Sequence, residues 1–129
     1  MQKLIVISLL FLTFFQSPKT LKGTWEYRGG KFNNKLSAAP KGYAQQRIYT
    51  DSKYEAFMYE NGQPPLKYES GNYALKGDTC LETQTYSLQP SKLKDVTVPY
   101  FYVVHKDTLF LVAKLPSGAV EEDFWVKVK

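Results

Sequence analysis

Few residues of the types that usually carry catalysis are present in this chain of 129 residues, which contains one histidine and one cysteine. A disulfide within the chain needs two cysteines, and a structural zinc site needs several Cys or His ligands, so both are excluded. His105 ends a strand-like run, and no serine or cysteine motif accompanies it to supply a nucleophile. We therefore expect an exposed or half-exposed His105 and no enzyme. Cys80 is expected to be a small core residue or, in an oxidising compartment, a site of pairing between chains.

Acidic residues follow one another at Glu121, Glu122 and Asp123, where paired carboxylates or a metal site would be possible. Successive side chains of a strand point to opposite faces, so Glu122 would point away from its two neighbours. We therefore predict a solvated start of a strand rather than a carboxylate cluster, with no metal and no cofactor. Gly29-Gly30 lacks the spacing and the following Lys-Ser/Thr of a phosphate-binding loop.

Aromatic side chains are unusually frequent, at 16% of residues, and Tyr and Phe favour the half-buried surface of a sheet. Arg47 shares one face of a strand-like run with Tyr43, Gln45 and Tyr49. In a barrel interior, Arg47 would need an anionic ligand group or a carboxylate partner, whereas outside it would be an ordinary surface residue. Alternation alone does not choose between the two faces. The predicted ligand-binding residues are Tyr27, Arg47, Tyr49, Phe57, Tyr59, Tyr73 and Tyr102.

The formal net charge is +5, but Lys and Arg are spread over most of the chain and are interleaved with acidic residues. A nucleic-acid surface would show a basic stripe with aligned aromatic residues, so no nucleic-acid partner is expected. At the N-terminus, Lys3 precedes the apolar run Leu4–Phe15 of 12 residues. This run is too short for a membrane span and is typical of a secretory signal peptide. We predict a signal peptide over residues 1–17 and one domain over residues 18–129, secreted or periplasmic and without stable membrane insertion.

Alternating runs separated by turn residues continue from Leu21 to the C-terminus, and no window shows a helical stripe longer than two turns. Short turns connect most neighbouring runs, which predicts an all-β fold: an eight-stranded antiparallel up-and-down barrel. Residues 29–42 interrupt this pattern. We expect there a binding loop, a mobile surface loop or a short helix around residues 36–39. The eight predicted strands are Leu21–Arg28, Tyr43–Thr50, Lys53–Glu60, Lys67–Leu75, Thr79–Leu88, Val98–His105, Thr108–Leu115 and Val120–Val128.

Four short motifs, in this order, resemble the lipocalins, and most closely the small secreted bacterial lipocalin-like domains: Gly23-Thr24-Trp25, Gly71-Asn72-Tyr73, the hairpin residues 107–111 and residues 121–125. The resemblance covers residues 21–129. Lipocalins usually place a basic residue of the last strand over the first-strand Trp, and Lys127 is the nearest candidate here. The related fatty-acid-binding proteins have two helices after their first strand, for which residues 29–42 are too short, so fatty acid is not implied as the ligand.

The resemblance and the aromatic content together favour an exported, non-catalytic protein that binds a small hydrophobic or amphipathic molecule in a barrel cavity. An eight-stranded barrel is just wide enough either to hold one small ligand or to be filled by its own side chains. The alternative is therefore a filled barrel that contacts protein or polysaccharide through a Tyr- and Lys-rich surface.

Overall fold

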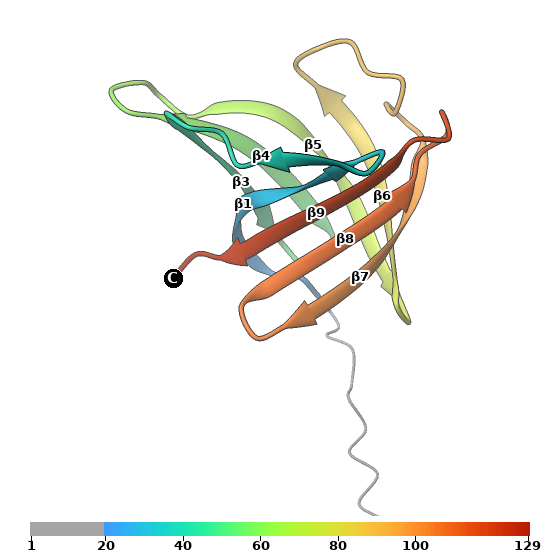
Figure 1. The fold of residues 1–129 in the computed structure, drawn as a ribbon. Helices are drawn as coiled ribbons and strands as arrows, with labels where there is room; N and C mark the ends of the chain where they lie inside the picture. Colours follow the sequence, from blue (N-terminus) through green and yellow to red (C-terminus); the bar gives the residue numbers. More distant parts are fainter. Residues whose placement is uncertain (1–19) are drawn as a thin grey trace, which may run out of the picture.

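The computed structural model describes residues 20–129, so the predicted signal peptide lies outside the described residues. The described chain forms one antiparallel sheet that closes into an eight-stranded barrel in up-and-down order, which confirms the predicted fold class (Figure 1). Within residues 20–129, no helix has the length and apolar character that a membrane crossing requires. The strands are β1 Gly23–Phe32, β2 Lys35–Ala38, β3 Tyr43–Tyr49, β4 Lys53–Glu60, β5 Leu66–Lys76, β6 Thr79–Ser87, β7 Thr97–His105, β8 Thr108–Lys114 and β9 Val120–Lys127.

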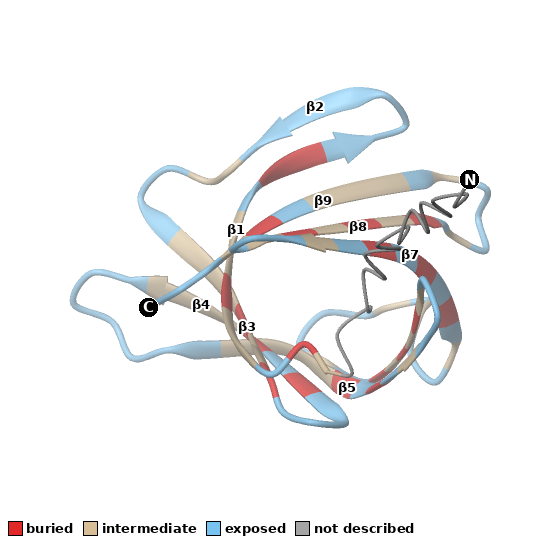
Figure 2. Cartoon of the chain, turned by 90° about the horizontal axis from the view of Figure 1, so that it is seen from below, coloured by how far each residue is buried: buried red, intermediate tan, exposed pale blue. Residues whose placement is uncertain are grey.

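Residues 29–38 form a β-hairpin, which corrects the expected loop or short helix there, and residues 39–42 connect it to β3. Strand β1 continues to Phe32, and the chain then turns at Asn33 and Asn34, which have φ angles of 49° and 66°. Asparagine tolerates this left-handed conformation, and two such residues in succession form the turn that favours a hairpin. The added strand β2 pairs only with the second half of β1 and is exposed along its whole length (Figure 2).

Strand β1 therefore has two different partners on one of its edges. Residues 23–26 pair with β3, and residues 29–32 pair with β2. On its other edge, β1 pairs with β9 from Trp25 to Phe32 and closes the barrel, with a bulge between Tyr27 and Gly29. The sheet consequently divides between β2 and β3 at the end of the barrel where β3 begins.

Two glycines allow neighbouring strands to approach closely. A Cβ atom on Gly30 would lie 1.9 Å from the Glu122 carbonyl oxygen, and one on Gly71 would lie 2.0 Å from the Thr83 carbonyl oxygen. No side chain fits at either distance, so glycine is required at both positions. The role of Gly30 in the Gly29-Gly30 pair is thus the close packing of β1 against β9.

The other end of the barrel is filled by side chains. Leu21, Trp25 and Tyr73 are buried there, and the Trp25 indole N–H donates to the Leu21 carbonyl oxygen at 2.8 Å. The Lys127 ammonium lies 5.5 Å from the centre of the Trp25 ring, in the position expected for the basic residue of the last strand. Cys80 is fully buried among these residues, as expected for a core residue.

Candidate ligand-binding cavity

A partly open cavity of about 550 Å³ occupies the end of the barrel where β3, β5 and β9 begin. One side of its rim comes from β2 and the residues that follow it, so the segment 29–42 does border the mouth. The lining residues are Tyr27, Ser37, Ala38, Pro40, Tyr43, Gln45, Arg47, Tyr68, Glu69, Glu121, Asp123 and Trp125.

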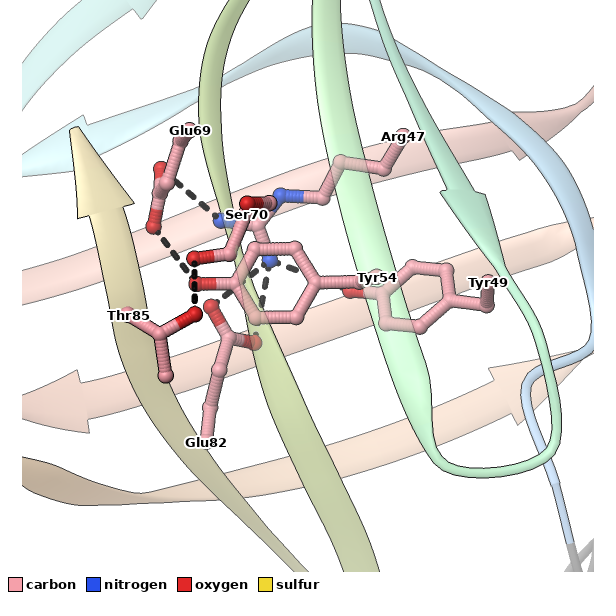
Figure 3. Close-up of polar contacts among 7 residues, drawn as sticks. All are labelled: Arg47, Tyr49, Tyr54, Glu69, Ser70, Glu82 and Thr85. Carbon is pink, nitrogen blue, oxygen red and sulfur yellow. Dashed lines mark hydrogen bonds and ion pairs between the residues drawn. The ribbon is translucent and has the colours of Figure 1, made fainter. Parts of the chain in front are cut away.

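Arg47 lies at the inner end of this cavity, so its side chain is on the inner face of β3. Its guanidinium group is held by carboxylates (Figure 3). One terminal guanidinium nitrogen is 3.0 Å from both carboxylate oxygens of Glu82 and 3.0 Å from the Tyr49 hydroxyl. The other terminal nitrogen is 3.7 Å from a Glu69 carboxylate oxygen. The Tyr54 hydroxyl donates to Glu69 at 2.8 Å, and the Arg47 guanidinium lies 4.9 Å from the centre of the Tyr54 ring. An interior Arg47 is expected to need either an anionic ligand group or a carboxylate partner, and the structure shows the carboxylate partner.

This network is buried, and burial shifts the pKa values of Arg47 and Glu82. Arg47 is 8% exposed and Glu82 is 4% exposed. Burial raises the pKa of Glu82, while the neighbouring Arg47 acts to lower it. Burial alone would lower the pKa of Arg47, but Glu82 and the other neighbouring groups raise it overall. The guanidinium therefore stays charged, and its positive charge is already balanced within the protein.

Carboxyl groups gather in the cavity, contrary to the expectation for residues 121–123. Alternation does send Glu122 to the outer face, but it leaves Glu121 and Asp123 together on the inner face. The closed barrel brings Glu69 from β5 to the same cavity. Burial and the neighbouring Glu121 raise the pKa of Asp123 to about 8. This group of carboxyl groups could not be predicted from one strand alone, because barrel closure assembles it from two.

Two buried N–H groups in the cavity wall lack a hydrogen-bond partner among the described residues. They are the Arg47 Nε–H and the Trp125 indole N–H. The Trp125 side chain, 4% exposed, packs against the Arg47 guanidinium at 5.2 Å and against the Tyr27 ring at 5.2 Å. A buried donor without an acceptor costs about 1–3 kcal/mol.

The structure brings only part of the predicted ligand-binding set to this cavity. Tyr27 and Arg47 line it, and Tyr49 contacts it only through Arg47. Tyr73 and Tyr102 are buried core residues whose hydroxyls donate to backbone carbonyl oxygens. Phe57 and Tyr59 lie on the outer face of β4. They pair with Gln46 and Ala44, the outward residues of β3, which corrects the face chosen for that strand.

The raised pKa of Asp123 predicts a pH dependence of stability. Between its ordinary range near pH 4 and about pH 8, the folded protein holds a proton on Asp123 that the unfolded chain releases. The free energy of unfolding should therefore fall with rising pH over this range, by up to about 1.4 kcal/mol per pH unit. Asp123→Asn should flatten this slope, as measured by urea unfolding at several pH values. An equal slope in both proteins would contradict the assignment of the proton to Asp123.

The comparisons with known proteins add no family to this geometry. Neither a protein-family model nor a curated protein sequence matches the chain.

Proposed function

We propose that this chain is an exported, non-catalytic binding protein that holds a small amphipathic molecule in the open end of a lipocalin-like barrel. The observation that supports it is the cavity of about 550 Å³, with aromatic walls and a buried polar network at its inner end. Small-molecule sites are usually clefts of roughly 300–1,000 Å³ with aromatic lining and a few fixed polar groups. The sequence motifs and the position of Lys127 over Trp25 agree with the resemblance to lipocalins.

The sequence left open whether the barrel is filled by its own side chains or has a cavity. One end is filled and the other end is hollow. Tyr27, Tyr43 and Tyr68 each contribute to the hollow end. Their rings offer apolar area and their hydroxyl groups offer hydrogen bonds, which suits a ligand with an apolar body and a polar head.

Neighbouring glutamines on β3 offer a matched test. Gln45 lines the cavity, whereas Gln46 faces outward and donates from its side chain to Glu26 at 3.1 Å. A screen of fatty acids, bile acids, tetrapyrroles and arylalkylamines should find a compound that raises the melting temperature of the full chain. Gln45→Trp should weaken the binding of that compound at least about tenfold by filling the cavity. Gln46→Trp should leave it unchanged. No stabilisation by any class, or equal binding to both variants, would overturn the proposal.

A second candidate function has support on the outer face of β7, β8 and β9. Phe101, Val103 and Phe124 are 50%, 40% and 39% exposed, and the Phe110 and Phe124 rings pack at 4.7 Å. A contiguous apolar face of this kind is characteristic of protein-contact surfaces. The face is made of Phe and Val rather than the Tyr and Lys expected from the sequence. Contact through it would be unaffected by Gln45→Trp.

A further inference from the structure

The charge of the cavity is opposite to the charge of the whole protein. The chain carries a formal net charge of +5, whereas three carboxyl groups, those of Glu69, Glu121 and Asp123, face the cavity. Arg47 is the one basic residue among the described residues that line it, and Glu82 already neutralises that guanidinium at 3.0 Å. The space open to a ligand is therefore bordered by more acidic than basic groups, although Asp123 holds its proton at neutral pH and Glu69 also lies near Arg47.

We propose that the cavity binds a small organic cation, a protonated amine carried on a flat ring-bearing body, in preference to an anion or an uncharged lipid. This inference rests on the proposed binding function and specifies its ligand. The ammonium group would lie against Glu121 and Asp123, and the ring would lie among the aromatic walls.

Aromatic side chains support an organic cation over a metal ion. No group of three or more His, Cys, Asp or Glu side chains in the described part of the chain is arranged to hold a metal. Tyr27 and Trp125 instead form an aromatic corner, with ring planes inclined at 59°. Such rings attract an ammonium group by their quadrupole and also provide apolar contact for the ligand body.

An anionic head group would find no free positive partner. Both terminal nitrogens of Arg47 face carboxylates, and an anion approaching from the mouth would pass Glu121 and Asp123. The remaining Arg47 Nε–H and the Trp125 indole N–H are buried donors without partners. A hydroxyl or ether oxygen on the amine could accept a hydrogen bond from one of these two N–H groups, once a small side-chain movement uncovers it.

The proton on Asp123 provides a second test of the proposal, because its release on amine binding can be measured. An ammonium ion beside Asp123 would favour its ionised form and displace the proton that its raised pKa holds at neutral pH. Amine binding should therefore strengthen as the pH rises towards 8 and should release a proton. The groups that face Asp123 from the surrounding strands are Glu121 on β9, Tyr27 on β1, Arg47 on β3, Tyr68 and Glu69 on β5 and Glu82 on β6.

Three matched compounds test the charge preference by calorimetry on the full chain: phenethylamine, hydrocinnamate and hydrocinnamyl alcohol. We expect phenethylamine to bind at least about tenfold more tightly than either of the others, with proton release seen as a difference between buffers. Glu121→Gln with Asp123→Asn should remove this preference. Glu122→Gln, a neutralisation on the outer face of the same strand, should retain it.

Each contrary outcome has a distinct meaning. Equal or tighter binding of hydrocinnamate or the alcohol, still blocked by Gln45→Trp, would overturn the amine inference and leave the cavity function standing. Displacement of phenethylamine by calcium, beyond that caused by sodium at equal ionic strength, would also overturn it. Absence of binding by these compounds and by the wider screen would overturn both. Gln and Asn keep the shape of the two carboxyl side chains, so the double variant should fold, and its unfolding curve verifies this.

Discussion

Replacement of Arg47 by methionine is expected to lower the free energy of unfolding by about 3–5 kcal/mol, the usual loss when one partner of a buried ion pair is removed. The reason is the carboxylate left behind. Glu82 is 4% exposed and has two of its contacts, at 3.0 Å, with Arg47. Without that guanidinium, Glu82 must either ionise in an apolar interior or take up a proton. Urea unfolding followed by tryptophan fluorescence would measure the loss, which is large against a typical total of about 5–15 kcal/mol.

Two comparisons separate the missing charge from the missing side-chain packing. The double variant Arg47→Met with Glu82→Gln should recover part of the loss. The deficit of the single variant should also narrow as the pH falls, because acid neutralises Glu82. Arg28→Met breaks only a surface pair with Glu26, at 2.7 Å and with the Arg28 side chain 56% exposed, and should cost less than about 1 kcal/mol. A single-variant loss as small as that of Arg28→Met would show that the buried network does not stabilise the fold.

Gly71→Ala is expected to destabilise the protein by about 3 kcal/mol or more, at the upper end of overpacking effects. A Cβ atom there would lie 2.0 Å from the Thr83 carbonyl oxygen and 3.0 Å from the Gln84 Cα atom. Both contacts are with backbone, so no side-chain rotation can relieve them. The β5–β6 pair must separate locally, next to the bulge between Ser70 and Gly71. Thermal unfolding followed by circular dichroism would measure the effect.

Gly77→Ala provides the control for this substitution. Gly77 lies in the turn between β5 and β6 with φ of +59°, and a Cβ atom there would meet no heavy atom within 4 Å beyond the adjoining residues. Alanine at that position carries only the left-handed backbone penalty, roughly 1–2 kcal/mol. Equal losses for the two variants would contradict a steric origin for the effect at Gly71.

The order of strands could be predicted from the sequence because it depends on local signals. Period-two alternation and polar turn residues mark each hairpin, and consecutive hairpins close into a barrel. The hairpin at residues 29–38 escaped prediction because β2 has only four residues and is fully exposed, so its alternation of polar and apolar residues is too short to indicate a strand. Its one local signal was the pair Asn33-Asn34, whose backbone conformation suits a tight turn.

The site was less predictable because it depends on which face of each strand turns inward and on contacts between distant strands. Arg47 could be identified as a candidate, but its partner Glu82 lies 35 residues along the chain and is brought to it only by closure. The bulges on β1, β5 and β6 also shift the pairing register between neighbouring strands. Phe57 lies at one of these shifts, where the outward direction follows from its pairing with Gln46 on β3.

The two-partner arrangement of β1 separates the hairpin through β2 from the strands that close the barrel. Barrel closure depends on the pairing of β1 with β3 and β9, while the hairpin through β2 contributes only to the rim. Asn33 bonds to Val120 of β9, whereas residues 35–42 pair with no described strand other than β1, so changes in residues 35–42 would alter the rim while leaving the barrel pairings in place. If the proposed binding function holds, the hairpin would be a natural position for diversification of the rim, by evolution or by library design.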